Sequence, residues 1–308
     1  MEGMDLVLGV DAGGTASKAV VTTRSGRVLG RGSAGPGNPS AIGSAAATAI
    51  GSAVQSALGD LDAGSVVAGV VGVAGVSRLA DPGVAAAFAA SWAALGLTCK
   101  ITVVGDAVTA LAAGASGTAG GTGTVLVSGT GAVAALVDGL RVVRTIDGLG
   151  WLLGDEGSGM WLGLQAVRAA ARYWSPDGLP AAVAAAAGVT NPDDLVHWAA
   201  ALPLRSFAAL APTVCTLATN GDPLATRITG EAVTRLLSTL DELRAPGVPV
   251  VLAGTLLVAN TPIRRGVVAA LRARGTDPGT ALDPALGAAR LAAHSIAARP
   301  AAASVVES

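Results

Sequence analysis

The chain has 308 residues and a formal net charge of −1 at pH 7, from 20 Lys and Arg against 21 Asp and Glu. This length allows one large domain or two smaller ones. Because the charge is close to zero, no basic surface supports nucleic-acid binding. The two cysteines, Cys99 and Cys215, are far apart and lack Cys-x-x-Cys spacing. This argues against a zinc site or a disulfide framework and fits a reducing cytoplasm.

The sequence predicts neither a signal peptide nor a membrane span. No basic and apolar leader precedes the first apolar run, so we expect a cytoplasmic protein. Residues 107–137 carry no charge, but Gly, Ser and Thr interrupt them repeatedly. A spanning helix needs about 20 mostly apolar residues. We therefore expect a helix, a loop and a buried strand here, and no membrane partner.

The first part of the chain predicts an α/β fold. An apolar run at residues 6–10 ends on Asp11, and a Gly-rich turn leads into a second run at residues 17–22, as in a β-hairpin. Three hairpin-connected strands followed by strands that alternate with helices indicate a mixed sheet. The other expected elements are a strand at 28–32, a helix at 41–58 capped by Ser40, a strand at 66–76, a helix opened by Asp81 and Pro82, a strand at 100–104 and a helix from Ala107.

A similar pattern restarts near residue 124. Strands are expected at 124–128, 132–137 and 141–145, so both halves begin with three strands joined by turns. We interpret this as a weak internal repeat of about 115 residues, which indicates two related domains facing one another. A mostly helical insertion, about residues 157–245, is followed by a strand at 248–253 and helices at 262–274 and 284–298.

Two Gly/Thr turns are candidate phosphate-binding elements. The first, Gly13-Gly14-Thr15 after Asp11, offers backbone N–H groups, a hydroxyl and a carboxylate that could hold Mg²⁺ through water. Alone it could equally be a plain tight turn. The second, Gly129-Thr130-Gly131, repeats the pattern, and two such turns favour a nucleoside triphosphate held between two domains. Neither a Walker-type loop nor a GxGxxG motif opening a helix is present.

Two further polar residues are candidates for a functional site. Asp106 comes directly after an expected strand, where ligands collect in open α/β sheets, and could take a proton from a substrate hydroxyl. It could also be a helix N-cap. Asn38 lies in a Gly/Pro loop, where it could bind a ligand or only form a turn.

Residues 148–159 form the most unusual stretch, with five glycines around the adjacent carboxylates Asp155 and Glu156. These carboxylates could accept hydrogen bonds from sugar hydroxyls. The alternative is a loop in which Ser158 caps the helix expected at 160–173. His197 and His294 have no partners at metal-ligand spacing, so we interpret both as structural.

Together these motifs resemble the sugar-kinase branch of the actin and hexokinase ATPase superfamily. More closely, the chain is similar to N-acetylglucosamine kinases and the related BadF-type (BadF/BadG/BcrA/BcrD) ATPases, over nearly its whole length. The segments that carry the resemblance are Val10-Asp11-Ala12-Gly13-Gly14-Thr15, Asn38, Gly105-Asp106-Ala107, Ser128-Gly129-Thr130-Gly131, Gly150-Trp151-Leu152-Leu153-Gly154-Asp155-Glu156-Gly157-Ser158, Val251-Leu252-Ala253-Gly254-Thr255 and Asp283-Pro284-Ala285-Leu286-Gly287-Ala288-Ala289.

The resemblance implies two ribonuclease-H-like (actin-like ATPase) domains with an interdomain cleft. The first would comprise residues 1–112 and a closing helix at 286–299, the second residues 113–285, with a tail at 300–308. ATP and Mg²⁺ would be the cofactors, an amino sugar the substrate, and the sugar's 6-hydroxyl the acceptor. Similar proteins are often homodimers.

The resemblance also assigns roles to residues. Asp106 would be the catalytic base and Asp11 would hold Mg²⁺. The sugar would be bound by Asn38, Asp106, Gly148, Leu149, Gly150, Asp155 and Glu156. ATP would be bound by Gly13, Gly14, Thr15, Gly129, Thr130, Gly131, Gly254 and Thr255.

Several residues depart from the family pattern. Leu149 stands where many members have Trp, Ala12 replaces a common Gly, and Ala132 and Val133 replace polar residues. The expected function is an ATP-dependent amino-sugar 6-kinase, with N-acetylglucosamine as the leading substrate and glucosamine or another hexosamine as alternatives. An ATPase that activates a radical dehydratase or reductase is a second class, although the two cysteines lack a suitable motif. A sugar-sensing regulator is a third, although no helix-turn-helix segment precedes Leu6.

Overall fold

The computed structural model describes residues 5–115 and 120–297, so the tail predicted at 300–308 lies outside the described residues. The chain divides into two compact units. Unit 1 comprises Met1–Gly121, Gly139–Arg141 and Asp283–Ser308, and unit 2 comprises Thr122–Asp138 and Val142–Leu282. Within the described ranges, no helix is long and apolar enough to cross a membrane.

Unit 1 is built on a five-stranded mixed sheet of order β3-β2-β1-β4-β5. The strands are β1 (Leu6–Ala12), β2 (Ser17–Thr23), β3 (Val28–Ala34), β4 (Val66–Val73) and β5 (Ile101–Gly105). β1, β2 and β3 form an antiparallel meander, and β4 and β5 run parallel to β1. The carboxyl ends of β1, β4 and β5 therefore meet at one edge of the sheet.

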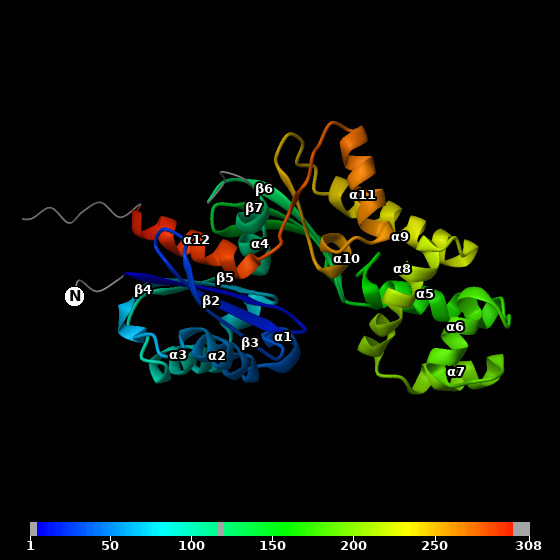
Figure 1. The fold of residues 1–308 in the computed structure, drawn as a ribbon, viewed down its shortest axis with the longest axis horizontal. Helices are drawn as coiled ribbons and strands as arrows, with labels where there is room; N and C mark the ends of the chain where they lie inside the picture. Colours follow the sequence, from blue (N-terminus) through cyan, green and yellow to red (C-terminus); the bar gives the residue numbers. More distant parts are fainter. Residues whose placement is uncertain (1–4, 116–119, 298–308) are drawn as a thin grey trace, which may run out of the picture. The chain divides into compact units, whose positions relative to one another are not determined.

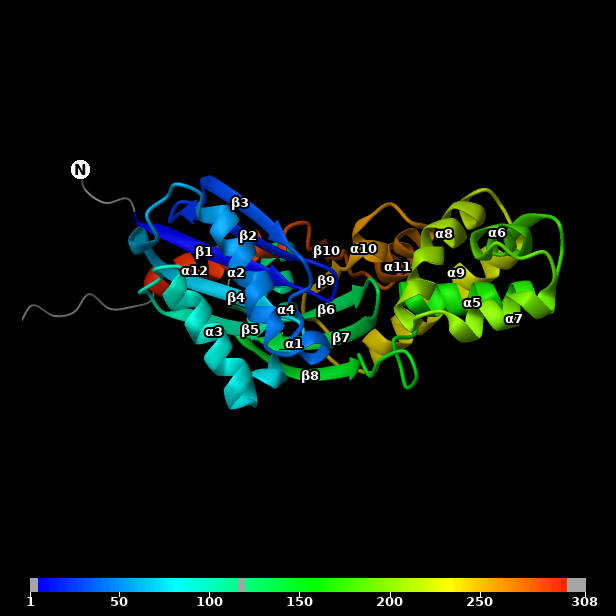
Figure 2. The same ribbon diagram turned by 90° about the horizontal axis from the view of Figure 1, so that it is seen from below.

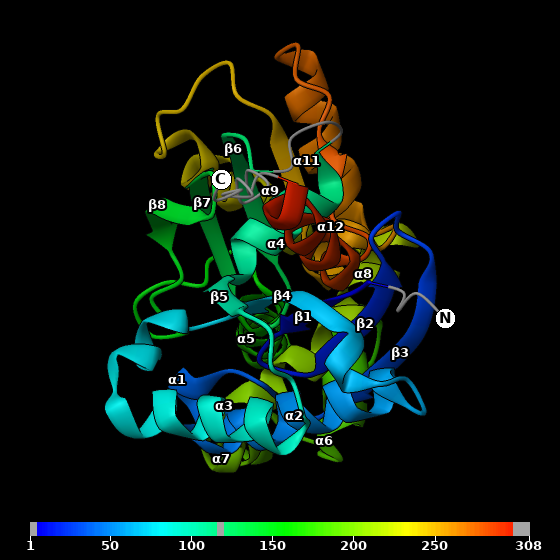
Figure 3. The same ribbon diagram turned by 90° about the vertical axis from the view of Figure 1, so that its left-hand side faces the viewer.

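Helices cover both faces of this sheet (Figures 1 and 3). The helices α2 (Ala45–Leu58) and α3 (Pro82–Ala94) lie on one face, and α4 (Asp106–Gly114) and α12 (Pro284–Ala297) lie on the other. Short helical turns complete the unit: α1 (Pro39–Ile42), η1 (Ala63–Ser65) and η2 (Val76–Ala80). Because both faces are covered, β1 is almost entirely apolar, and Leu8 and Val10 are fully buried.

The closing helix α12 packs very tightly on the sheet. A side chain at Gly9 of β1 would overlap the carbonyl oxygen of Ala285 and the backbone nitrogen of Ala289. Gly287 similarly touches the Thr109 carbonyl of α4. The last helix of the chain is thus fixed to the first strand because glycine leaves room for direct backbone contact.

Unit 2 contains a second five-stranded sheet, of order β10-β9-β6-β7-β8. Its strands are β6 (Gly123–Ser128), β7 (Ala132–Asp138), β8 (Arg141–Asp147), β9 (Val250–Ala253) and β10 (Gly279–Thr280). β6 pairs antiparallel with β7 and parallel with β9. The two sheets thus share one strand order, as the internal repeat predicted. Among the strands that the structure describes, only the two-residue β10 has no counterpart among the expected strands.

The insertion between β8 and β9 is helical, as expected, and lies beside the second sheet, with which it shares one hydrophobic core (Figure 2). Leu162, Leu179, Leu195 and Leu236 are fully buried in its core. Its helices are α5 (Gly159–Arg172), α6 (Gly178–Ala187), α7 (Pro192–Ala201), η3 (Leu204–Leu210), α8 (Ala211–Thr219) and α9 (Pro223–Asp241), and α10 (Thr255–Val258) and α11 (Pro262–Ala273) follow β9.

One expected helix is divided in the structure. The chain turns at Gly43, whose φ of 58° lies in the left-handed region, so residues 41–58 form α1 and α2 rather than one helix. The expectation that Ser40 caps this helix is therefore wrong. Asn38 is the N-cap of α1, and its Oδ1 accepts a hydrogen bond from the Ser40 N–H at 2.8 Å.

We predict that Gly9→Ala destabilises the protein by about 1–3 kcal/mol or more, because the added methyl group must push α12 away from β1. Gly35→Ala is the matched control, since a side chain there meets no atom within 4 Å. Urea denaturation of both variants measures the effect. Equal free energies of unfolding for the two variants would contradict the tight contact.

Candidate functional site

The candidate site carboxylates of unit 1 lie at the carboxyl ends of its parallel strands. Asp11 is the penultimate residue of β1, and Asp106 directly follows β5. Burial raises the pKa of Asp11 to about 7, and the negative charges of Asp106 and Asp283 add to this rise. Lys18 opposes it from the facing position on β2. Two carboxylates that repel one another in a partly buried site are suited to hold a divalent cation.

Asp106 is the first residue of α4, and the N-cap position belongs to Gly105. Asp106 Oδ1 accepts the N–H of the adjacent Ala107 at 3.0 Å, whereas an N-cap side chain bonds the N–H two or three positions further on. The N-cap alternative for Asp106 is therefore wrong. Burial raises its pKa, and hydrogen bonds from the backbone of Ala107 and of Asp106 itself oppose the rise.

The first Gly/Thr turn connects β1 to β2 beside these carboxylates. The Gly13 N–H donates to the Ala16 carbonyl at 2.9 Å, and the Gly13 carbonyl accepts the Gly37 N–H at 3.0 Å. The second bond brings the loop that contains Asn38 against the turn. Asn38 Oδ1 also lies beside Gly75, just beyond β4. Gly14 and Thr15 are at the tip, and Thr15 is exposed.

The second Gly/Thr turn, Gly129-Thr130-Gly131, connects β6 to β7 in unit 2. The first N–H groups of α5 bind its carbonyls: Gly159 N–H donates to Gly129 at 2.7 Å, and Met160 N–H donates to Thr130 at 3.3 Å. Gly254 has φ 82°, and a side chain there would overlap the Ser128 carbonyl. Unit 2 thereby brings together two segments predicted to contact ATP, residues 129–131 and residues 254–255.

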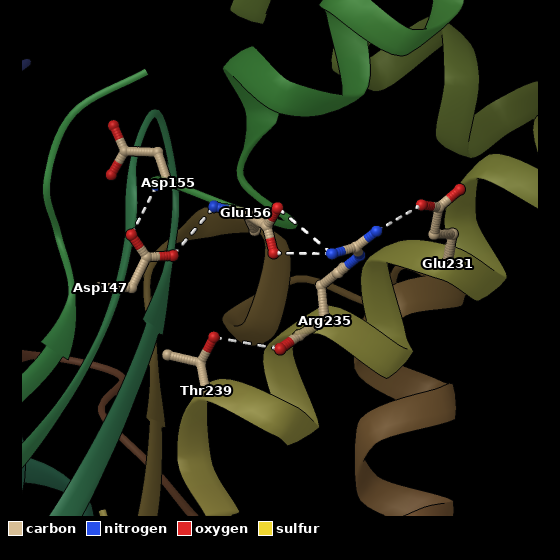
Figure 4. A network of polar contacts seen from close by, with 6 residues as sticks. All are labelled: Asp147, Asp155, Glu156, Glu231, Arg235 and Thr239. Atoms are coloured by element: carbon tan, nitrogen blue, oxygen red, sulfur yellow. Dashed lines mark hydrogen bonds and ion pairs between the residues drawn. The ribbon is translucent and has the colours of Figure 1, made fainter. Parts of the chain in front are cut away.

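A hydrogen-bonded network organises the loop between β8 and α5 (Figure 4). Asp147 Oδ1 accepts the Asp155 N–H at 2.6 Å, and its Oδ2 accepts the Glu156 N–H at 3.0 Å. Both aspartates have left-handed backbones, with φ of 64° for Asp147 and 57° for Asp155. Such conformations are costly outside glycine, so the two bonds hold a strained loop in one shape.

Asp147 was missed as a site residue by sequence reasoning. The available signal was an acidic residue at the end of a strand and directly before a glycine, a position typical of tight turns. Its partners lie eight and nine residues further along the chain, however. No local pattern indicates a hydrogen bond of that separation.

Asp155 joins this loop to the second Gly/Thr turn. Its Oδ1 accepts the Ala132 N–H at 3.0 Å, and its carboxylate lies against Gly131. Burial raises its pKa, the bond from Ala132 lowers it, and Asp147 raises it further. In Figure 4 the carboxylate points away from Asp147. Asp155 is therefore anchored at one oxygen and can offer the other to a ligand.

Glu156, adjacent in sequence, has a different environment. Its carboxylate accepts hydrogen bonds from Arg235 Nη1 at 3.2 and 3.3 Å, and Arg235 Nη2 contacts Glu231 at 3.2 Å (Figure 4). Arg235 and Glu231 both belong to α9. These exposed ion pairs contribute little stability, but they direct Glu156 toward α9.

Ser158 Oγ accepts the Trp161 N–H at 3.1 Å, so Ser158 is the N-cap of α5.

The remaining predicted sugar residues form the loop before Asp155. The Gly148 N–H donates to the Ala132 carbonyl at 3.0 Å, and the Gly150 carbonyl accepts N–H groups from Leu153 and Gly154. Gly148 and Gly150 have φ of 71° and 81°, which explains why glycine is needed at both positions. Leu149 is 65% exposed.

The described residues contain no group of three or more His, Cys, Asp or Glu that could hold a metal ion. The Asp11 carboxylate nevertheless fits Mg²⁺, because this ion is usually held by one or two carboxylates together with substrate phosphates. The two cysteines belong to different units, Cys99 to unit 1 and Cys215 to unit 2. Burial raises the pKa of both thiols, which disfavours the thiolate form that binds metals.

Comparison with known proteins agrees with this arrangement. The BadF/BadG/BcrA/BcrD ATPase family matches residues 8–292. A solved structure from Chromobacterium violaceum, provisionally named an N-acetylglucosamine kinase, is 25% identical, with a TM-score of 0.74 over 94% of this chain and 99% of that one. No curated protein matches the chain.

Two other solved structures share the fold at lower identity. A ROK family glucokinase from Streptomyces griseus, in complex with glucose and AMPPNP, is 21% identical, with a TM-score of 0.59 over 94% of this chain and 99% of that one. Component A of the (R)-2-hydroxyglutaryl-CoA dehydratase from Acidaminococcus fermentans is 16% identical, with a TM-score of 0.50 over 95% of this chain and 99% of that one. The α/β fold with two actin-like ATPase domains is thus confirmed.

We predict that Asp147→Asn lowers the free energy of unfolding by about 1–3 kcal/mol, because one backbone N–H in the loop then faces an amide donor instead of an acceptor. Asn tolerates the left-handed backbone, so the effect isolates the lost hydrogen bond. Asp177→Asn, on the surface of the same unit, is the matched control. Denaturation curves that coincide for the two variants would show that Asp147 does not hold the loop.

We predict that the metal-free protein loses stability as the pH rises from about 4 to about 7. The folded state keeps Asp11 protonated in this window while the unfolded state releases the proton, so ionisation favours unfolding by about 1.4 kcal/mol per unit of pKa shift. Asp11→Asn should flatten this part of the curve, and Asp60→Asn, on the surface of unit 1, should leave it unchanged. Parallel curves for the wild type and Asp11→Asn would refute the expectation.

Proposed function

Because this chain belongs to the BadF/BadG/BcrA/BcrD ATPase family, we propose that it is an ATP-dependent amino-sugar kinase that phosphorylates a sugar 6-hydroxyl. N-acetylglucosamine is the leading substrate, and glucosamine or another hexosamine is the alternative. The observation that carries the proposal is the pair of strand-end carboxylates Asp11 and Asp106 beside a Gly/Thr turn. Unit 2 adds a second such turn with the anchored carboxylate of Asp155 against it.

We assign ATP to the Gly/Thr turns. Their backbone N–H groups can surround phosphate oxygens without obstruction by side chains, and the hydroxyl groups add donors. Asp11 would hold Mg²⁺ through water, and Mg²⁺ would neutralise charge on the phosphates during transfer. The residues in these roles are Gly13, Gly14 and Thr15 in unit 1, and Gly129, Thr130, Gly131, Gly254 and Thr255 in unit 2.

Asp106 is the proposed base. It would accept the proton of the sugar 6-hydroxyl as the oxygen attacks the γ-phosphoryl group. Burial favours this role because it raises the pKa of Asp106, and a carboxylate with a raised pKa is a stronger proton acceptor. Phosphoryl transfer depends mainly on positioning and charge neutralisation, so one base, one metal and an array of N–H donors suffice.

Asp155 is the proposed anchor for the sugar hydroxyls in unit 2, and the backbone of Gly148, Leu149 and Gly150 would complete that contact. Asn38 would contribute from unit 1 through its amide nitrogen, since its Oδ1 already caps α1. We give Glu156 a positioning role in place of direct sugar binding, because Arg235 occupies its carboxylate.

Activation of a radical dehydratase is the weaker alternative. The likeness to the dehydratase component concerns the fold alone. The cysteines that would hold an iron–sulfur cluster, Cys99 and Cys215, both have thiols whose pKa is raised by burial. No feature of the described residues favours this function over sugar phosphorylation.

We predict that the wild type forms ADP in a sugar-dependent manner and that Asp106→Asn lowers kcat by about 10²- to 10⁴-fold while sugar binding is retained. A coupled ADP-release assay over N-acetylglucosamine, glucosamine and N-acetylmannosamine measures turnover, and calorimetry measures binding. Asp60→Asn serves as the surface control. No sugar-stimulated turnover by the wild type would refute the kinase proposal, and a fully active Asp106→Asn would refute the assignment of the base.

A further inference from the structure

Unit 2 contains a cavity of about 320 Å³ next to the anchored carboxylate of Asp155. This volume falls in the lower part of the range typical of small-molecule sites, roughly 300–1,000 Å³. The loop before Asp155, the first half of α5, the end of α7 and the turn η3 form its walls. The residues that define it are Trp151, Asp155, Met160, Trp161, Ala200 and Phe207.

The lining of the cavity is mostly apolar. Among the side chains that the structure describes, Asp155 is the only titratable one in the lining, and aromatic and aliphatic side chains make up most of the rest. The wall is rigid on the η3 side: Phe207 packs edge-on against Trp198, with ring centroids 6.3 Å apart. Gly163 of α5 is in direct contact with the Phe207 carbonyl. These contacts pack η3 against α5 and α7 at this wall of the cavity.

The chain does not use its own apolar side chains to fill this space. Leu152 and Leu153, in the loop that forms one wall, are 72% and 75% exposed, and Trp151 is 41% exposed. Burying one such side chain would stabilise the fold through the hydrophobic effect. An open apolar cavity beside exposed apolar loop residues is typical of a surface that a ligand completes.

We propose that this cavity is a subsite for an apolar substituent on the amino sugar that Asp155 holds, a substituent larger than an acetyl group. The inference rests on the proposed function, since it places the sugar at Asp155. Asp155, in the lining, would hold a sugar hydroxyl through its free carboxylate oxygen, and the apolar side chains around the cavity would exclude polar groups. A longer N-acyl chain and an alkyl group on the anomeric oxygen share the required chemistry, and the experiment distinguishes them.

The test measures the dissociation constants of two series of glucosamine derivatives by calorimetry without ATP. One series carries N-acyl chains of two, four and six carbons, and the other is N-acetylated and carries anomeric methyl, butyl and hexyl groups. Each buried methylene should tighten binding about fourfold until the cavity is full. The series that shows this dependence identifies which substituent enters the cavity.

Two variants test whether the dependence of affinity on chain length arises from the cavity. Ala200→Trp fills its mouth from the exposed side of α7, and Leu164→Ala removes part of its wall. Ala200→Trp should weaken the dependence on chain length and Leu164→Ala should extend it to longer chains, whereas Ala186→Trp, on the exposed side of α6, should leave it as in the wild type. The same dependence in Ala200→Trp, Leu164→Ala and the wild type would overturn the proposal.

ADP release in the same series separates this proposal from the proposed function. Turnover without any dependence of affinity on chain length in either series overturns the subsite and leaves the kinase proposal intact. Affinity that rises with chain length but without turnover of any derivative supports the subsite and overturns the kinase proposal.

Discussion

The parallel pairing of β1, β4 and β5 is the constraint on which the chemistry of unit 1 depends. Parallel strands end at the same edge of a sheet, so Asp11 and Asp106, almost a hundred residues apart, come within electrostatic range of one another. The pairing needs β1 to be buried on both faces. The closing helix α12 provides one of those faces, and Gly9 allows its close approach. The packing of α12 on β1, beside Asp11, therefore helps to determine the geometry of the carboxylates.

In unit 1 the order of the strands positions the candidate site residues, whereas in unit 2 a loop with a strained backbone positions them. The loop before α5 holds two aspartates in left-handed conformations, and the Asp147 carboxylate compensates by binding two successive N–H groups. This arrangement fixes the direction of the Asp155 side chain, which in turn binds the Ala132 N–H. A flexible loop would lose side-chain and backbone entropy each time it bound a ligand. A loop that is already ordered binds without that loss.

The charges of the two units illustrate a conflict between stability and function. Asp11 and Asp106 are partly buried and repel each other, and burial raises the pKa of both. Glu156, by contrast, is satisfied by Arg235. If the site served stability alone, we would expect a basic residue to neutralise Asp11 and Asp106, as Arg235 neutralises Glu156. Unpaired carboxylates at a strand edge are therefore the feature that most strongly indicates binding or catalysis.

The sequence alone determined the elements whose signals are local. Apolar runs that end in glycine located the hairpins after Asp11 and Ser128 and the strand before Asp106, because strand and turn propensities act over a few residues. The pair Asp81 and Pro82 located a helix start in the same way. The order of these elements also indicated the repeated α/β architecture. Local signals failed at Ser40, since only the position of Gly43 in the folded chain shows that α1 and α2 are separate.

Only the tertiary structure revealed the role of Asp147, the pairing of Glu156 with α9 and the apolar cavity beside Asp155. Each depends on contacts between segments whose separation in the sequence carries no pattern. Arg235 is 79 residues from Glu156, and the cavity is formed by a loop, two helices and a turn. A sequence specifies such neighbours only through the packing of the whole unit.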